Sequence, residues 1–511
     1  MRRSLRQSLD GVGLAPPSGW RRAAIVALLV LGVALRLRSY LANRSLWYDE
    51  SFLALNIIDR DFAGLARPLD HNQAAPLGFL WAERLFVNLF GSSEYALRAV
   101  PLLAAICALV VFWWLVSMSL PAAGTVLAIA MFSISEPLIR YAVEVKQYSL
   151  DVAIAAILWA TFTKMKSRLD HDDLGAWALA TLLGAATIWV SHPAIFVLGG
   201  ISIHWLWLRL RRHTWNALLM PASCSFIWVG SFIALYVVSL RFVPAPLQAA
   251  WSHGHANAPL VPLAAQDLGR FVDVVWTLSV IPLGHHVVQL VTLGAVVGVV
   301  ALWRHGHAQL WWFAGTLALV WLASSLGKYP VALRLWLFFA PAIILLVAAG
   351  VDEVWRHTRR TFPVLAPIVA CLILAYPIFT AANAALWPRE HEEIRPLLQK
   401  LREHYRDGDC VYLYSRASRA AALYYAKRGI VIPGTVVVGM ESADRYQGEA
   451  DVQTLQGRGR VWVLFSHVRQ RPDGLDDEKL FVHLLDRVGV RLDVTRQTGA
   501  SLYLYDLSRR P

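Results

Sequence analysis

Long apolar runs separated by short polar segments occupy most of the first 383 residues of the chain. A run of about 17–22 apolar residues is long enough for a helix to cross the core of a bilayer. The short runs on either side of 191–194 are expected to form a tight hairpin. In total the pattern predicts about eleven spans, near residues 23–40, 97–118, 121–138, 147–163, 175–190, 193–208, 217–240, 286–303, 308–326, 335–351 and 363–383.

Basic residues indicate which ends of these spans face the cytoplasm. Cytoplasmic loops carry an excess of Lys and Arg, and the basic segments of this chain fall on one side of the predicted map. With the N-terminus on that side and an odd number of spans, the C-terminal tail is expected outside. These segments are the N-terminal arginines, 164–168, 209–213, Arg304 and 356–360.

The first apolar run is interpreted as an uncleaved span. A signal peptide would need small residues after its apolar stretch, and Arg36 and Arg38 stand there instead. The long loop that follows, residues 41–96, contains two segments with apolar residues at helical spacing, 50–60 and 76–90. A similar segment occurs at 268–278. All three are expected to be helices that lie along the outer membrane surface.

The tail changes from apolar runs to alternating helices and strands. Helices are predicted at 392–405, 416–429 and 476–489, strands at 461–468 and 500–507, and a turn followed by a strand at 407–415. This order indicates a small α/β domain with a largely parallel sheet. Because it lacks a glycine-rich phosphate loop, the domain is interpreted as a lid or docking unit.

The whole pattern therefore predicts a polytopic α-helical membrane protein with a small α/β domain on its outer side. The expected divisions are a basic cytoplasmic N-terminus at 1–22, a transmembrane region at 23–383 with its outer loop at 41–96, and an outer domain at 384–511.

The composition favours a membrane protein over a soluble one. Of the 511 residues, 57% are hydrophobic and only 16% are charged, and the mean hydropathy is +0.47. The net charge of +13 lies largely in short loops, so it is interpreted as a topology signal and not as a nucleic-acid-binding surface. The four cysteines indicate neither a disulfide framework nor a thiolate metal site.

Candidate chemistry collects on the outer side. Charges at a membrane boundary are costly unless they are paired or functional, so acids and bases on one side predict a shared, solvated cavity. The residues concerned are Asp49, Glu50, His71, Asn72, Gln73, Glu144, Lys146, Gln147, Tyr148, Lys328, Tyr329 and Arg334.

Structural explanations remain open for several of these residues. Asp49 also suits the start of the helix that follows it. Glu144 and Lys146 also suit a solvated interfacial pair, and Lys328 and Arg334 suit side chains that extend to lipid headgroups.

Other polar residues suggest ligands less directly. Arg36, Arg38 and Arg98 lie at the outer ends of spans, against the charge rule, which favours an anionic partner such as a lipid phosphate. His192 is interpreted as a satisfied polar residue. His253 and His255 have the spacing of metal ligands but lack a nearby third ligand.

Three stretches resemble one group of membrane enzymes. YDESF at 48–52, FGSSEYALR at 90–98 and EVKQYSLD at 144–151 together resemble the bacterial multispanning glycosyltransferases of the C-type superfamily. These are similar to protein O-mannosyltransferases and to the aminoarabinose transferases that modify lipid A. The resemblance covers residues 30–160 well and 327–350 moderately.

The resemblance implies roles for the acidic residues. Asp49 matches the general base of such enzymes, and Glu50 would support it. Glu144 matches the acid of the second outer loop, which lies near the acceptor or donor sugar. The first loop has NQAAP at 72–76 where the aminoarabinose transferases carry a KPP-like stretch, so the donor and the metal stay open.

The resemblance also implies substrate contacts. Lys146, Gln147 and Tyr148 would help to hold the sugar phosphate, and Lys328 and Arg334 would meet the phosphate of a polyprenyl carrier. Further candidate substrate-binding residues are His71, Asn72 and Tyr329.

The predicted function is transfer of a hexosyl or pentosyl group from a polyprenyl-phosphate carrier to an acceptor hydroxyl. A direct displacement with Asp49 as base would invert the anomeric centre. The expected place is the periplasmic face of a bacterial inner membrane, with membrane lipids as further partners and no nucleic acid. The reaction requires no particular cofactor, although a divalent metal ion is a candidate. Alternatives are a transporter or flippase for a lipid-linked glycan, a polysaccharide polymerase or ligase, and a non-catalytic scaffold.

Overall fold

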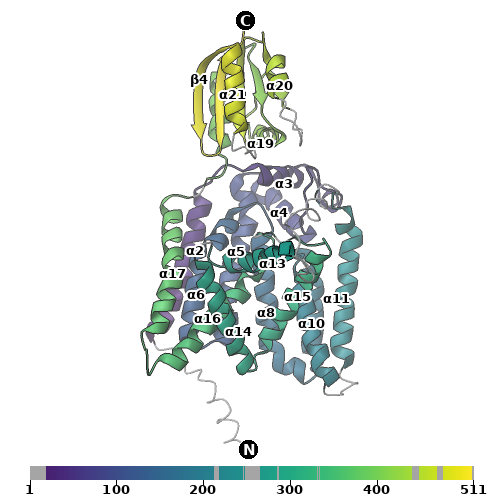
Figure 1. The fold of residues 1–511 in the computed structure, drawn as a ribbon. Coiled ribbons are helices and arrows are strands. Elements are labelled where there is room, and N and C mark those ends of the chain that lie inside the picture. Colours follow the sequence, from purple (N-terminus) through teal and green to yellow (C-terminus); the bar gives the residue numbers. More distant parts are fainter. Residues whose placement is uncertain are drawn as a thin grey trace, which may run out of the picture.

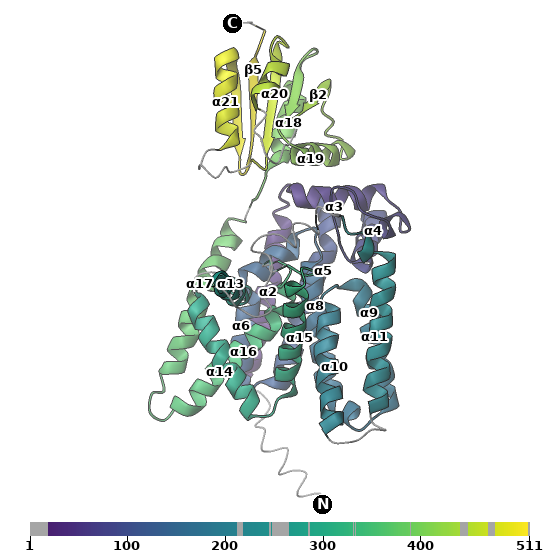
Figure 2. The same cartoon turned by 45° about the vertical axis from the view of Figure 1, so that its right-hand side comes forward.

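A helical bundle forms the body of this computed structural model, and a small α/β domain stands over one end of it (Figure 1). The structure describes residues 19–211, 218–244, 247, 265–284, 287–330, 332, 334–388, 390–439, 448–468 and 476–508. The two helices of the long first loop, α3 (Tyr48–Asp59) and α4 (Leu77–Phe90), lie between the bundle and the α/β domain (Figure 2).

The runs predicted as spans all fold as helices. The bundle consists of α2 (Gly19–Leu41), α5 (Glu94–Ser119), α6 (Ala122–Ile134), α7 (Glu136–Arg140), α8 (Tyr148–Asp170), α9 (Leu174–Val190), α10 (Ala194–Arg211), α11 (Leu219–Val238), α14 (Val288–Arg304), α15 (Ala308–Ser325), α16 (Ala340–Thr358) and α17 (Leu365–Leu386). The predicted hairpin is confirmed, because α9 ends at Val190 and α10 begins at Ala194.

Not all of the bundle helices are long and apolar enough to cross a membrane. Among the described residues, six helices are long and apolar enough to cross a membrane, and a seventh is gained if α6 and the bent segment after it count as one span. The helices α9 and α14 are apolar but shorter. Close packing supports the bundle, since a Cβ at Gly298 or Gly350 would collide with the backbone of the facing helix, so these glycines let α14 and α16 approach.

The three surface helices predicted from apolar spacing are confirmed as helices. They are α3, α4 and α13 (Ala265–Val280). Asp49 and Glu50 lie in the first turn of α3, where negative charge complements the helix dipole. The predicted segment 76–90 begins at Pro76, which is the residue just before α4.

The α/β domain contains a five-stranded sheet in the order β2-β1-β3-β5-β4. Its elements are α18 (Ile394–His404), β1 (Cys410–Leu413), α19 (Arg416–Lys427), β2 (Thr435–Val438), α20 (Gly448–Leu455), β3 (Arg460–Ser466), α21 (Asp477–Val488), β4 (Val490–Gln497) and β5 (Ala500–Asp506).

The prediction of a largely parallel sheet was wrong. Strand β1 is parallel to β2 and β3, but β5 is antiparallel to both β3 and β4. The strands β2 and β4 and the helix α20 were not predicted. Strand β4 is largely exposed at an edge, and it joins β5 through a tight turn at Gly499, whose φ of 65° favours glycine.

The α/β domain shares a hydrophobic core with the first loop. Side chains of α3 and α4 pack with those of α18, α19 and the sheet in one buried cluster. Polar contacts cross the same boundary: the Tyr425 hydroxyl meets the Leu46 backbone N–H at 3.0 Å, and Tyr424 donates to the Ser92 carbonyl at 3.0 Å. The domain is therefore held directly on the loop that carries the acidic pair.

Candidate active site

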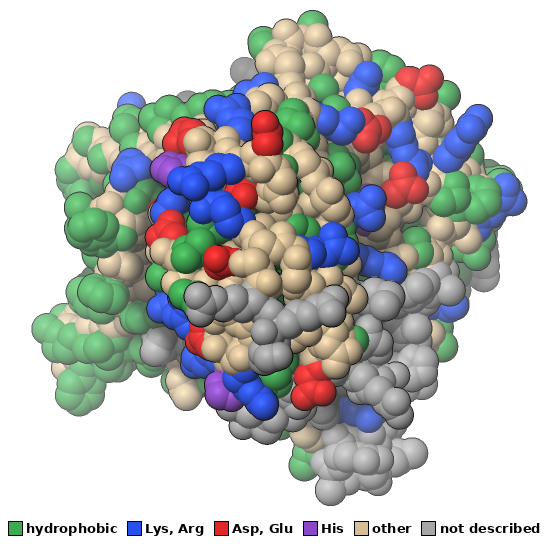
Figure 3. Space-filling model, turned by 90° about the horizontal axis from the view of Figure 1, so that it is seen from above, with side chains coloured by type: hydrophobic (Ala, Val, Ile, Leu, Met, Phe, Trp, Pro, Cys, Tyr) green, Lys and Arg blue, Asp and Glu red, His purple; other side chains and the backbone are tan. Residues whose placement is uncertain are grey.

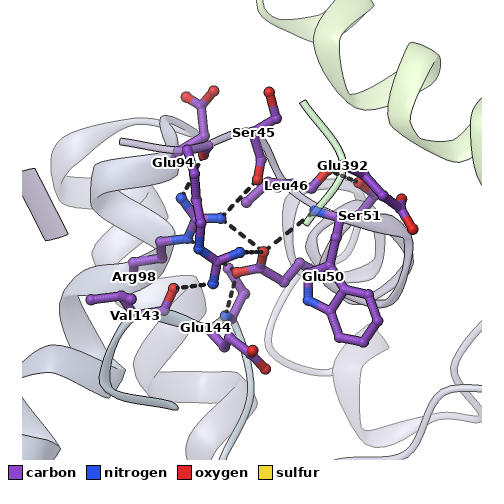
Figure 4. A network of polar contacts seen from close by, with 12 residues as sticks. Ser45, Leu46, Glu50, Ser51, Glu94, Arg98, Val143, Glu144 and Glu392 are labelled. Atoms are coloured by element: carbon purple, nitrogen blue, oxygen red, sulfur yellow. Dashed lines mark hydrogen bonds and ion pairs between the residues drawn. The ribbon is translucent and has the colours of Figure 1, made fainter. Parts of the chain in front are cut away.

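Glu50 is the centre of a buried ion-pair network (Figure 4). Its carboxylate is 0% exposed and accepts from Arg98 at 3.0 and 2.8 Å and from Arg44 at 3.1 Å. The backbone N–H of Val145 donates to it at 2.9 Å, and that of Trp47 at 3.4 Å. Burial alone would raise the pKa of Glu50, but Arg44 and Arg98 hold it below its usual value. Glu50 thus ties α3 to α5 and to the segment before α8.

Two arginines expected to meet an anionic partner are occupied inside the protein. Arg98 is 2% exposed and, besides Glu50, donates to the Arg44 and Ser45 carbonyls at 2.7 and 3.2 Å. Arg36 is fully buried and donates to backbone carbonyls of α2 and α6. Their departure from the charge rule therefore has an internal, structural cause. Arg38 is exposed.

Asp49 lies between two cations from distant parts of the chain. Lys146 Nζ is 2.9 Å from Oδ1, and Arg334 Nη1 is 3.0 Å from Oδ2. Gln73 completes the group, because its amide nitrogen lies 3.4 Å from Asp49 Oδ1 and its carbonyl oxygen accepts from Lys146 at 2.7 Å. Asp49 is 7% exposed, whereas 40% of the Arg334 side chain is accessible. The group therefore reaches solvent through Arg334.

The two cations control the charge of Asp49. Burial would raise the pKa of this carboxyl, but Lys146 first, and then Arg334, outweigh it and keep the pKa below its usual value. Asp49 is therefore ionised at neutral pH. A carboxylate bound by two cations is a weak base, and it gains basicity only when one of them is drawn away.

Glu144 lies beside the Glu50 network, in the segment before α8 (Figure 4). It is 1% exposed, with Oε1 at 3.3 Å from Arg140 and Oε2 without a hydrogen-bond partner among the described residues. Burial raises its pKa, opposed by Arg44 and reinforced by Glu50. Glu144 therefore has a freer oxygen and a more basic carboxylate than Asp49.

The remaining predicted residues fall into two groups. Gln147 and Tyr148 are buried beside the site, and the Tyr148 ring packs edge-on against Tyr141 at 5.2 Å. Tyr329 is half-buried and donates to the Leu335 carbonyl at 2.6 Å, in the loop that carries Arg334. The other three, which are exposed and outside the Asp49 group, are His71, Asn72 and Lys328.

The loop around His71 positions Gln73, to which the sequence analysis gave no role in the site. His71 and Asn72 have φ angles of 61° and 54°, and this left-handed turn brings the next residue, Gln73, inward to Asp49 and Lys146. Asn is common in such a turn, so NQ in the sequence is a weak signal for it. Arg44 was also missed, because nothing local indicates its contact with Glu50.

The α/β domain fixes the start of α3 next to Asp49. Glu393 accepts from the Ser45 backbone N–H at 2.9 Å, and Glu392 accepts from that of Tyr48 at 3.1 Å. His467 stands over the Tyr48 ring, with centroids 3.7 Å apart, and its Nδ1 is 2.9 Å from Glu392. Movement of this domain would therefore displace the first turn of α3.

The described residues contain no group of three or more His, Cys, Asp and Glu side chains that could hold a metal ion. Both oxygens of Asp49 already have cationic partners. His253 and His255 lie outside the part of the chain that the structure describes.

Comparison with family models and with curated proteins finds no match. Among solved structures, the chain is similar to apo ArnT from Cupriavidus metallidurans, with a TM-score of 0.52 and 12% identity over 95% of this chain and 98% of that one. ArnT bound to undecaprenyl phosphate matches at 0.50, with the same identity and coverage. The archaeal oligosaccharyltransferase AglB from Archaeoglobus fulgidus, in complex with an inhibitory peptide and a dolichol-phosphate, matches at 0.51 with 10% identity over 95% and 74%. At these identities the likeness establishes the fold.

Proposed function

We propose that this chain, which has the fold of the multispanning C-type glycosyltransferases, transfers a sugar from a polyprenyl-phosphate carrier to an acceptor hydroxyl. The observation that carries the proposal is the Asp49 carboxylate held between Lys146 and Arg334 at the end of the bundle. The fold is shared with an ArnT bound to undecaprenyl phosphate and an AglB bound to a dolichol-phosphate. A lipid-linked donor is consistent with both.

The donor phosphate would bind at Lys146 and Arg334. Both side chains already pair with the Asp49 carboxylate, and Arg334 is exposed enough to turn from Asp49 to an incoming phosphate. Lys146 is more deeply buried and would follow only in part. The isoprenoid chain would lie against the apolar faces of the bundle helices below.

Donor binding would at the same time activate Asp49. Each cation that turns to the phosphate stops lowering the pKa of the carboxyl, while burial continues to raise it. Asp49 would then be a competent base when a donor is present and a weak one when it is absent. The base would therefore become active only after the donor has bound.

The displacement itself would proceed in one step. Asp49 takes the proton of the acceptor hydroxyl, whose oxygen attacks the anomeric carbon as the bond from that carbon to the phosphate oxygen breaks. The polyprenyl phosphate leaves with the bonding electrons, and Arg334 and Lys146 neutralise the charge that develops on it. A single displacement of this kind inverts the anomeric centre.

Other residues would support binding. Glu144 has one carboxylate oxygen, Oε2, with no hydrogen-bond partner in the described part of the chain, and it would accept from a sugar hydroxyl. Gln147 and Tyr148 would contact the sugar phosphate. Glu50 is proposed only as a positioning residue, because every face of its carboxylate is engaged inside the protein.

The proposed orientation places this end of the bundle and the α/β domain on the periplasmic side of a bacterial inner membrane. A divalent metal ion is a separate prediction, and the proposed displacement does not use one.

The test compares cell-envelope glycans, by mass spectrometry, from cells that lack the protein and cells that produce the wild type, Asp49→Asn or Asp61→Asn. Asp61 is an exposed carboxylate in the same loop and serves as the matched control. A glycan change present with the wild type and Asp61→Asn, and absent with Asp49→Asn at equal protein level, supports the proposal. A fully active Asp49→Asn protein would remove the assigned base.

A further inference from the structure

A second polar cavity lies between the first loop and the α/β domain. It measures about 210 Å³ and is lined by Leu55, Asn56, Asp59, Asp70, His71, Leu423 and Lys427. Its floor is α3 with the 70–71 turn, and its roof is α19, which lies across α3 (Figure 2). The catalytic step described above uses none of these residues.

The floor of the cavity is built rigidly. The Asn56 side chain is 2% exposed and accepts from the Asp70 backbone N–H at 2.8 Å while donating to the Asp70 carbonyl at 3.2 Å. Arg60 holds the Asp70 carboxylate at 2.8 Å. Across the cavity, Lys427 on α19 lies 2.7 Å from Asp59 on α3.

These charged groups keep capacity for a ligand. An ammonium group has three protons to donate and a carboxylate accepts at about four positions, so one ion pair leaves most of them free. Both partners in the Asp59 and Lys427 pair are about half exposed. The cavity therefore offers donors and acceptors side by side, as the hydroxyls of a sugar require.

Two arginines on the roof helix stand beside the cavity, next to the residues that line it. Arg416, Arg419, Leu423 and Lys427 follow one another at helical spacing and are all exposed, so they form one face of α19. Neither Arg416 nor Arg419 has a carboxylate within ion-pair distance among the described residues. Both nevertheless affect the pKa of His71 in the cavity wall. Burial lowers this pKa, Arg416 and Arg419 lower it further, and Asp70 opposes them without restoring the usual value. Basic side chains are prominent on this end of the molecule (Figure 3).

The cavity and the Asp49 site lie along the same helix, α3. Residues 49, 52, 56 and 59 follow at helical spacing, and Asn56 is two turns beyond Asp49, a rise of about 10 Å. Aromatic rings fill the interval: His71 stacks on Phe52 at 4.8 Å, and Phe52 meets Tyr48 edge-on at 5.9 Å. Such a surface suits the apolar face of a sugar ring.

We infer that this cavity binds an acidic saccharide unit of the acceptor, about two helix turns from the hydroxyl that is glycosylated. Asp59, Asp70 and Lys427 would bind its hydroxyls, and Arg416 and Arg419 its carboxylate or phosphate. A cavity of about 150 Å³ holds a benzene molecule, so one of about 210 Å³ is large enough for a single sugar ring. The inference rests on the proposed function, for which it names the class of acceptor.

The test measures binding to the purified full-length protein by ligand-observed saturation-transfer NMR. The probes are glucose, glucuronate and glucose 6-phosphate. Inorganic phosphate has no carbon-bound protons to observe, so its binding is measured by its competition with glucose 6-phosphate. We expect the two acidic sugars to bind at least about tenfold more tightly than glucose, because each charge-assisted contact is strong. The double variant Arg416→Gln with Arg419→Gln should lose this preference, and Lys479→Gln, an exposed cation on α21, should keep it.

Three results would overturn the inference: equal binding of glucose and glucuronate, an unchanged preference in the double variant, or inorganic phosphate binding as tightly as glucose 6-phosphate. Lys427→Met provides a second check and should weaken all three sugars.

Failure of this inference is separable from failure of the catalytic proposal. Asp49→Asn should bind the acidic sugars like the wild type, since Asp49 does not line the cavity. If binding is normal but Asp49→Asn still transfers sugar, the catalytic proposal alone fails. If Asp49→Asn is inactive but no probe binds, only the acceptor site is wrong.

Discussion

Glu50→Gln and Asp49→Asn should have opposite consequences, although the two residues are adjacent. Glu50→Gln keeps the size of the side chain but removes the charge that Arg44 and Arg98 share. These two side chains are 7% and 3% exposed, so water cannot replace the lost carboxylate. Removing one partner of a buried ion pair typically costs about 3–5 kcal/mol. We expect Glu50→Gln to lower the stability of the first loop by that amount.

Asp49→Asn should cost less stability than Glu50→Gln, because of its two cationic partners only Lys146, 6% exposed, is deeply buried. Arg334 is accessible to water, and Lys146 keeps its contact with the Gln73 carbonyl at 2.7 Å. Loss of the Asp49 carboxylate should appear instead in the rate of sugar transfer, since a general base typically contributes about 10²–10⁴-fold to a rate.

The assay is thermal unfolding in detergent together with hydrogen exchange. Glu50→Gln should lower the midpoint clearly and increase exchange in the segments that it joins, residues 44–50 and 143–146. A double variant, Glu50→Gln with Arg98→Gln, should recover part of the loss because one unpaired charge is gone. If Glu50→Gln unfolds like the wild type while Asp49→Asn unfolds early, the assignment of a structural acid and a chemical acid is refuted.

Three further predictions follow from the same contacts. Arg334→Ala should raise the KM for a polyprenyl-phosphate donor at least about tenfold, because a charge-assisted phosphate contact is lost; an unchanged KM in a donor titration would contradict the phosphate role. Lys146→Met should shift the acid limb of kcat/KM to higher pH, since the first cation that lowers the pKa of Asp49 is removed; a pH–rate profile identical to the wild type would exclude that coupling. Glu83, fully buried on α4 with no hydrogen-bond partner among the described residues, has a pKa raised well above its usual value by burial. Its stabilising contribution is present below the unfolded pKa of about 4.3 and is lost as pH rises toward the folded pKa. Glu83→Gln should therefore make the unfolding temperature less sensitive to pH above 5. Identical curves of unfolding temperature against pH for the two proteins would contradict this.

The sequence by itself determined the helices and the class of fold. Apolar runs and helical spacing are local patterns, so they located the long bundle helices and the three surface helices. The order of helices and strands likewise indicated the α/β domain. It did not reveal strand β4 or its antiparallel pairing with β5. Strand β4 lies at an edge and is mostly exposed, so it lacks a strong apolar pattern.

Only the tertiary structure decided what each charged residue does. Successive residues of a helix point about 100° apart, so Asp49 faces Lys146 and Arg334 while Glu50 faces Arg44 and Arg98. Arg334 is 285 positions from Asp49 along the chain, and no local pattern encodes that pairing. The sequence could therefore predict acids and bases on one side of the spans. The choice of partner, which distinguishes the buried acid Glu50 from the proposed base Asp49, depends on how the helices pack.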